Sequence, residues 1–248
     1  MSQSYTKSGT FETADLFGYP VFIQSSESAL QYTLTNSQAG NNTHVVTMNP
    51  EMIMQGLKNS LLHQAILSAS VIIPDGTGVV WALKRKRIAV KRLPGIEFAT
   101  ALLKQAEKNN AGVAIIGAQS EVLTAAIKQL CKQFENLNVV FYHHGYYSEE
   151  EEASIVSNCA NAKPKLVLIA LGVPRQELWI ARYKSFFQGA TLMGIGGSLD
   201  VWSGSIQRAP LLFRQLNLEW LYRITTEPWR LKRVYKTLPL FALKVLLS

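Results

Sequence analysis

The sequence predicts an α/β protein, with a mostly parallel β-sheet flanked by helices and a helical appendage at the C-terminal end. Short apolar runs alternate with longer segments of helical periodicity over most of the chain, as in βαβ units. After Pro210 the pattern changes to helical periodicity alone, interrupted by Pro228 and Pro239. A hydrophobic fraction of 48% in 248 residues is enough for a sizeable core and argues against disorder.

Seven short apolar runs, rich in β-branched residues, are expected to be strands. They are Val21–Ile23, Val45–Thr47, Val71–Ile73, Val113–Ile116, Val139–Tyr142, Leu166–Ala170 and Thr191–Gly194. The clearest helical segments between them are Gly95–Asn109, Ser120–Phe134 and Ser148–Asn161. Ser148 and Glu151 have capping-box spacing, so the acidic run 149–152 is predicted to be a solvated helix start.

The charge is concentrated in the last part of the chain. Residues 208–248 contain eight basic and two acidic residues, a net charge of +6, whereas the whole chain carries +8. We therefore expect three parts: a loose leader over 1–18, an α/β body over 19–207 and a basic amphipathic helical appendage over 208–248. A basic, aromatic-rich appendage on a nearly neutral body indicates an anionic partner, either nucleic acid or a membrane surface.

The remaining sequence features favour a cytoplasmic protein. No run reaches the roughly 18 apolar residues of a membrane span, and residues 1–13 lack the apolar core of a signal peptide. The two cysteines, Cys131 and Cys159, are far apart, which is typical of reduced thiols.

Asp75 is the leading candidate for a catalytic residue. The segment Val71–Trp81 places this carboxylate after an apolar run, in a turn with Gly76 and Gly78. The carboxyl end of a strand in an open α/β sheet is where ligands bind, and glycines allow close approach to the backbone. A helix N-terminus beside it favours an anion, so Asp75 is interpreted as a general base next to a phosphate leaving group. The alternative is a helix-capping Asp in a tight turn.

Three further loops follow apolar runs in the same way. In the first, Thr47 offers a hydroxyl and Asn49 an amide, although Asn49 also suits an ordinary helix N-cap. The second is Leu171–Glu177, in which Gly172 permits close approach and Gln176 begins a helix. The third is Gly194–Asp200, a glycine-rich turn with a carboxylate.

Several other chemistries are disfavoured. Neither glycine-rich turn has the GxGxxG spacing with a distal acid that a nicotinamide enzyme would need, so no cofactor is expected. His143 and His144 are adjacent on a predicted strand and point to opposite faces, which argues against a metal site. No GxSxG elbow and no Ser-His-Asp arrangement is evident.

The appendage carries three arginines, Arg223, Arg230 and Arg233, which share one helical face if the helix runs through Pro228. Aromatic residues are interleaved with them, as in helices that lie in a membrane surface. Guanidinium groups also bind phosphates bidentately. The alternative is a solvated basic face over an apolar stripe.

Taken together, these segments resemble the WecG/TagA/CpsF family of bacterial glycosyltransferases (glycosyltransferase family 26), over about residues 18–244. The matching blocks are, in chain order, Thr47–Glu51, Pro74–Trp81, Arg92–Gly95, Gly145–Tyr147, Leu171–Ile180, Gly194–Asp200, Arg208–Pro210, Leu218–Arg223 and Glu227–Pro228. Each block is weak alone, but the ordered set is specific. The family pattern often has Asp at position 144, Gly-Gly at 117–118 and Lys at 175, and these departures leave the sugar open.

The resemblance implies a Rossmann-like catalytic domain over 19–207 and a membrane-associated appendage over 208–248. It implies inverting transfer of a sugar from a UDP-sugar to an undecaprenyl-diphosphate-linked saccharide, with Asp75 as general base and Thr47 as a neighbouring hydroxyl. The substrate-binding residues that it implies are Asn49, Gly76, Arg92, Gly172, Gln176, Gly197, Asp200, Arg223, Arg230 and Arg233, of which the last three would close over the diphosphates.

The expected partners are therefore a UDP-sugar of N-acetylmannosamine, uronic acid or glucose type, a lipid-diphosphate-linked acceptor and an anionic membrane surface. No nucleic acid and no metal is expected, and a homo-oligomer is left open. The expected location is cytoplasmic, on the inner face of the cell membrane, in cell-surface polysaccharide synthesis. The alternative is a non-catalytic nucleotide-binding module that its basic tail tethers to an anionic surface.

Overall fold

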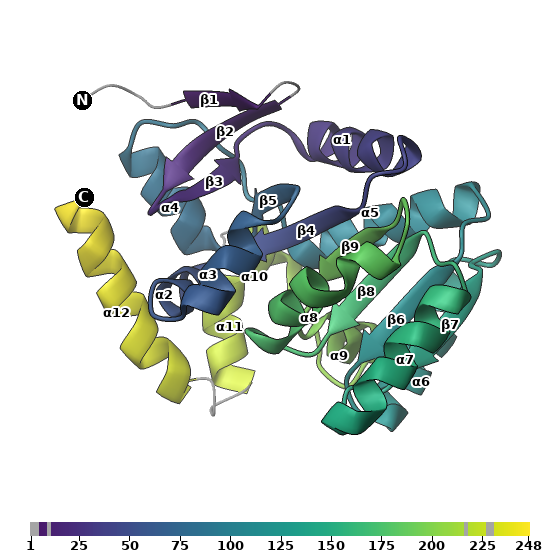
Figure 1. The fold of residues 1–248 in the computed structure, drawn as a ribbon. Coiled ribbons are helices and arrows are strands. Elements are labelled where there is room, and N and C mark those ends of the chain that lie inside the picture. The colour runs from purple at the N-terminus through teal and green to yellow at the C-terminus, as the bar shows by residue number, and fades with distance from the viewer. Residues whose placement is uncertain (1–4, 9–10, 216–217, 227–230) are drawn as a thin grey trace.

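The computed structural model describes residues 5–8, 11–215, 218–226 and 231–248. Its centre is a six-stranded sheet in the order β5-β4-β9-β8-β6-β7, in which every neighbouring pair is parallel (Figure 1). The strands are β4 (Thr43–Met48), β5 (Val71–Pro74), β6 (Val113–Gly117), β7 (Val139–His143), β8 (Leu166–Ala170) and β9 (Thr191–Gly194). The predicted Rossmann-like parallel sheet flanked by helices is confirmed.

Helices cover both faces of this sheet (Figure 1). They are α1 (Ser26–Gln38), α2 (Pro50–Gly56), α3 (Ser60–Leu67), α4 (Thr77–Arg85), α5 (Gly95–Lys108), α6 (Ser120–Gln133), α7 (Glu149–Asn161), α8 (Arg175–Tyr183), η1 (Lys184–Phe186), α9 (Ser198–Ser203), α10 (Leu211–Gln215), α11 (Glu219–Thr226) and α12 (Leu231–Leu247). The three clearest predicted helices correspond to α5, α6 and α7, and the capping box of Ser148 and Glu151 is present.

The strands alternate their side chains between two layers of core, because successive residues of a strand point to opposite faces. In β8, Leu166 and Leu168 pack with α5 and α6, whereas Val167 and Ile169 pack with α7 and α8. All four are buried. A strand that is apolar on both faces is expected in a parallel sheet covered by helices on both sides.

The expected loose leader over 1–18 is wrong for its described residues, 5–8 and 11–18. Strands β1 (Tyr5–Ser8), β2 (Phe11–Leu16) and β3 (Tyr19–Phe22) form a separate antiparallel sheet. Ala14 and Leu16 of β2 are fully buried against α4 and the neighbouring core. The predicted strand Val21–Ile23 overlaps β3 at Val21 and Phe22 only, and β3 pairs with β2 rather than with the parallel sheet. Burial of Ala14 and Leu16 in β2 and of Tyr19 and Val21 in β3 holds this small sheet in place. The polar residues between them conceal this pattern in the sequence.

The appendage is helical, as expected, but α12 is not broken at Pro239, which lies inside the helix. Proline in a helix interior costs about 3 kcal/mol. Phe241 and Val245 are buried in the same core cluster as residues of α2, and burying side chains of this size offsets a cost of that order. In Figure 1, α12 accordingly lies alongside α2. Pro228 lies outside the described residues. Among the described helices, none is both long and apolar enough to cross a membrane.

Candidate active site

A cavity of about 690 Å³ lies at the carboxyl edge of the parallel sheet. Its walls include residues that follow β4, β5, β8 and β9, together with the start of α5. Residues of α2 and α4 also line it, and the appendage adds residues of α11 and α12, among them Trp220, Ile224 and Phe241. Body and appendage therefore enclose one site together.

Asp75 follows β5 directly and lines this cavity. Its backbone is held by a hydrogen bond from its own N–H to the Met48 carbonyl oxygen, at 3.0 Å. The Arg92 guanidinium donates through Nη2 to the Asp75 carboxylate at 3.3 Å and through Nε to the Asp75 carbonyl oxygen. Burial raises the pKa of the Asp75 carboxyl, while Arg92 and the Gly95 N–H oppose the rise. A carboxylate with raised proton affinity facing a cavity can accept a proton from a bound hydroxyl.

Gly76 and Gly78 have a packing role that the sequence reading missed. A Cβ on Gly76 would lie 2.6 Å from Cδ of Pro50, and one on Gly78 would lie 2.6 Å from its Cγ. The Gly76 N–H donates to the Met48 carbonyl oxygen at 3.0 Å. The glycines therefore allow the loop after β5 to pack against the start of α2. Gly76 still lines the cavity, as a substrate-binding residue would.

Thr47 and Asn49 reach the cavity from the end of β4. Thr47 is buried, and its hydroxyl donates to the Gly194 carbonyl oxygen at 3.5 Å. A Cβ on Gly95 would meet Thr47 Cγ2 at 2.9 Å and Asp75 Oδ2 at 3.5 Å, so Thr47 and Asp75 flank one point of α5. Asn49 caps α2 by accepting from the Met52 N–H at 2.9 Å, which is the ordinary N-cap role that the sequence also allowed.

Gln176, near the start of α8, lines the cavity and is held in a buried hydrogen-bond chain. Its Nε2 donates to Glu177 at 3.0 Å, and its Oε1 accepts from the Gly196 N–H at 3.2 Å. Glu177 is also bonded to His44 Nε2 at 2.9 Å, and both side chains are fully buried. A carboxylate on one side and an N–H on the other allow one orientation of the Gln176 amide, which fixes the wall formed by Gly196.

The other predicted residues of the loops 171–177 and 194–200 differ in whether they line the cavity. Gly172 and Gly197 line the cavity, and Gly172 has a positive φ of 74° that favours glycine. Asp200 lies in α9 after the lining residues Gly196–Ser198 and does not itself line the described cavity. Its proposed role at the nucleotide therefore has no geometric support in this structure.

The three predicted tail arginines cannot be placed in the site. Arg230 lies outside the described residues, as do the side chains of Arg223 and Arg233. The backbone of Arg223 belongs to α11 and that of Arg233 to α12. Their closing role remains a prediction.

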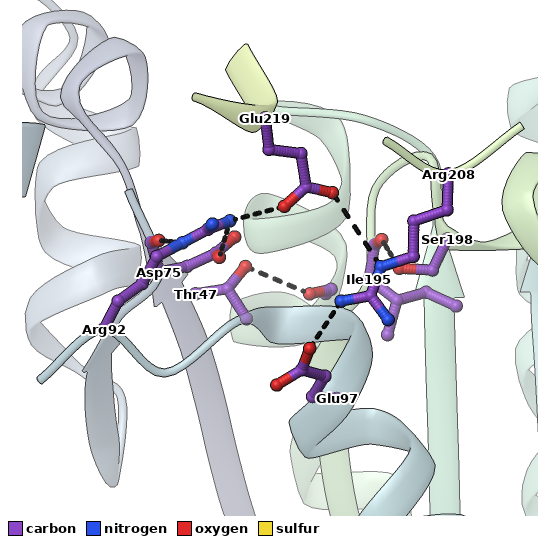
Figure 2. Close-up of polar contacts among 9 residues, drawn as sticks. Thr47, Asp75, Arg92, Glu97, Ile195, Ser198, Arg208 and Glu219 are labelled. Atoms are coloured by element: carbon purple, nitrogen blue, oxygen red, sulfur yellow. Dashed lines mark hydrogen bonds and ion pairs between the residues drawn. The ribbon is translucent and has the colours of Figure 1, made fainter. Parts of the chain in front are cut away.

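Sequence reasoning missed a chain of charged side chains that reaches Asp75. Arg92 Nη2 is 3.1 Å from Glu219 Oε2, Glu219 Oε1 is 3.9 Å from Arg208 Nε, and Arg208 Nη2 is 2.6 Å from Glu97 (Figure 2). Arg208 and Glu219 belong to segments that carried the family resemblance, but nothing in their spacing indicated contact with Arg92. Figure 2 shows Glu219 extending toward Arg92 and Arg208 from the appendage side.

The described part of the chain contains no group of three His, Cys, Asp or Glu side chains arranged to hold a metal ion. The polar residues that line the cavity include Thr47, Asn49, Asp75, Arg92 and Gln176, and Glu51 and Glu219 add two further carboxylates. The Asp75 carboxylate beside the Arg92 guanidinium suits proton removal next to an anion.

The sequence is similar to those of known proteins. The sequence model of the glycosyl transferase WecG/TagA/CpsF family matches residues 14–248. The chain is 38% identical, over 214 residues, to the N-acetylglucosaminyldiphosphoundecaprenol N-acetyl-beta-D-mannosaminyltransferase of Staphylococcus aureus strain NCTC 8325 / PS 47, covering 86% of this chain and 83% of that protein. Proteins of the same name from the COL and MRSA252 strains match with the same identity and coverage.

Proposed function

Because the chain belongs to the glycosyl transferase WecG/TagA/CpsF family, we propose that it transfers N-acetylmannosamine from UDP-N-acetylmannosamine to an N-acetylglucosaminyl-diphosphoundecaprenol acceptor. The acceptor and the transferred sugar are those in the name of the Staphylococcus aureus relatives. At 38% identity a UDP-linked uronic acid or glucose is the alternative donor within the same chemistry. The product would be a lipid-linked disaccharide for a cell-surface polysaccharide.

The proposed reaction is a single displacement with inversion. An acceptor hydroxyl oxygen attacks the anomeric carbon of the donor while the bond from that carbon to the UDP oxygen breaks. The hydroxyl proton passes to Asp75, and UDP leaves with the bonding electron pair. The observation that carries this proposal is the position of Asp75, which faces the cavity with a raised pKa and Arg92 beside it.

The charge that develops on UDP needs a stabilising partner. Arg92 supplies one guanidinium at the cavity, and we propose that Arg223, Arg230 and Arg233 supply others when the appendage covers a bound diphosphate. On this proposal the transfer needs no metal ion.

We also propose that the enzyme acts at the inner face of the membrane, where its lipid-linked acceptor would be met. The support is the outer side of α12, where Leu240, Leu243, Leu246 and Leu247 are exposed. The adjacent Lys236 and Lys244 complement anionic lipid.

The test of the proposed base is the variant Asp75→Asn in an assay of UDP release with lipid-linked acceptor, in the presence of EDTA. We expect turnover to fall by about 100- to 10,000-fold, the usual contribution of a general base, with folding unchanged by circular dichroism. Asp15→Asn is the matched control, because Asp15 is exposed on β2 and does not line the cavity.

Wild-type activity in Asp75→Asn would remove Asp75 from the mechanism. Binding of UDP by the wild-type chain without turnover of any UDP-sugar would instead favour the non-catalytic nucleotide-binding module. Activity that disappears with EDTA and returns with a divalent cation would overturn metal independence alone.

A further inference from the structure

The Glu219 carboxylate of the appendage contacts the catalytic edge of the body. Glu219 is the first residue of α11, and its side chain lies between two guanidinium groups. Arg92 and Asp75 come from the body, so the ion-pair chain joins the proposed base to the appendage (Figure 2).

Burial distinguishes this contact from an ordinary surface ion pair. The Glu219 side chain is 7% exposed and that of Arg92 is 18% exposed. Exposed ion pairs contribute little to stability, but a buried carboxylate needs a compensating cation. With α11 docked, the charge of Glu219 is therefore compensated by Arg92 and Arg208, and Arg92 forms an ion pair with the appendage.

Arg92 contacts two carboxylates through the same terminal nitrogen, Nη2. Its Nε is engaged by the Asp75 carbonyl oxygen, and its Nη2 lies 3.3 Å from the Asp75 carboxylate and 3.1 Å from the Glu219 carboxylate. A guanidinium shared between two carboxylates stabilises the charge of each less than it would stabilise one alone.

We propose that Glu219 is a positioning residue that couples docking of the C-terminal helices to the strength of the base, by drawing the Arg92 charge away from Asp75. The proposal rests on the proposed role of Asp75 as the base. With α11 docked, Asp75 binds the acceptor proton more strongly. With α11 displaced, Arg92 is left to Asp75 alone and the base is weaker. The enzyme would then be fully active only when the appendage covers the cavity, which limits loss of the donor to water.

The electrostatics of Asp75 agree with this coupling. Asp75 is faced by Thr47 from β4, by the Gly95 N–H from α5, by Arg92 from the loop before α5 and by Glu219 from α11. Arg92 and Glu219 are the charged side chains among these described neighbours. Burial raises the pKa of Asp75 most, Arg92 lowers it, and the negative charge of Glu219 raises it again.

The test is the pH dependence of kcat/KM for UDP release by the full chain with lipid-linked acceptor, in wild type and in Glu219→Gln. The acid limb reports ionisation of the base in the free enzyme. Removing the Glu219 charge leaves Arg92 to Asp75, so the pKa of Asp75 falls and the acid limb moves to lower pH, by about one unit. The plateau is expected to fall by roughly three- to tenfold, because the base is weaker and α11 is held less firmly.

Two further variants separate coupling from a structural effect. Glu97→Gln removes the Arg208 contact at the outer end of the same chain, and Glu97 is 54% exposed, so the acid limb should stay at the wild-type pH. Glu219→Asp keeps the charge but withdraws it by one methylene, so a smaller shift in the same direction is expected. This variant decides the matter if Glu219→Gln does not fold.

An acid limb at the wild-type pH in a folded Glu219→Gln, or in Glu219→Asp where that variant has to decide, would overturn the coupling. If Asp75→Asn were inactive in the same assay, the base assignment would stand without it. Wild-type activity in Asp75→Asn would overturn the proposed function itself, whatever Glu219→Gln did. A shift of equal size in Glu97→Gln would also overturn the proposal, because Glu97 has no contact with Asp75 or Arg92 in the chain.

Discussion

The two sides of the cavity are built in different ways. On the body side, backbone hydrogen bonds and close glycine contacts place Asp75 and Asn49, because the loop after β5 packs directly on the loop after β4. On the appendage side, the described long-range contacts are made by side chains, among them Phe241 and Val245 in the core and Glu219 with its arginines. The body edge is therefore set by the fold of the sheet, whereas the described contacts of the appendage with the body are those of side chains.

This difference assigns different tasks to the two sides. A catalytic carboxylate works best when rigid elements hold it, and the ends of parallel strands provide them. A cover over the site must open for a donor and a lipid-linked acceptor, and contacts made by side chains rather than by a shared sheet suit that task. Variants on each side should accordingly fail differently.

The largest expected effect on stability is that of Phe241→Ala on the appendage side. Phe241 is 1% exposed, and truncating a buried Phe costs about 3–5 kcal/mol. Because the contact joins α12 to α2, we expect chemical denaturation to show an early transition for the appendage, with UDP release reduced. Leu243→Ala, at an exposed position of the same helix, is the control and should leave the denaturation curve unchanged. A loss below about 1 kcal/mol in Phe241→Ala would mean that α12 does not depend on this contact.

A smaller effect is expected for Gly76→Ala on the body side. The added Cβ would lie 2.6 Å from Pro50 Cδ, and overpacking of this kind costs about 1–3 kcal/mol. The loss should occur in the main unfolding transition, with UDP release reduced because the loops that carry Asp75 and Asn49 are forced apart. Adding Pro50→Ala to Gly76→Ala removes the clash, so the double variant should recover part of the lost stability. Strictly additive losses would contradict the packing explanation.

The smallest effect on stability is expected where the appendage faces outward. Leu243 and Leu246 are about half exposed on α12. Changing both to Ser should therefore alter the free energy of unfolding by roughly 0.5 kcal/mol or less. Binding to vesicles of phosphatidylglycerol and phosphatidylethanolamine should nevertheless weaken by about tenfold or more, because lipid can cover only the exposed half of each leucine and each loss is therefore about 0.7–1.5 kcal/mol. The matched control is Leu61→Ser with Leu67→Ser, which changes two exposed leucines of α3. Equal weakening by both pairs would contradict a membrane role specific to α12.

The body was predictable from its sequence to a large extent. The β-branched apolar runs of β4 to β9 and the helices α5, α6 and α7 lie where the local patterns placed them, because strand and helix periodicity are properties of neighbouring residues. The carboxyl edge of the sheet followed from that alternation, and it brought Thr47, Asp75 and Gln176 to one cavity. The leader was misread because β2 mixes polar and buried residues, so its burial depends on partners elsewhere in the chain.

The sequence by itself determined the parallel sheet, the edge at which the cavity lies, the basic helical appendage and the family. Each of these can be predicted from periodicity, composition or ordered motifs. The tertiary structure alone decided that Arg92 lies between Asp75 and Glu219, and that His44 supports Glu177 behind Gln176. Arg92 and Glu219 are 127 positions apart in the chain, and His44 and Glu177 are 133 positions apart. No local pattern encodes such pairs, because which buried charges meet is set by how whole elements pack.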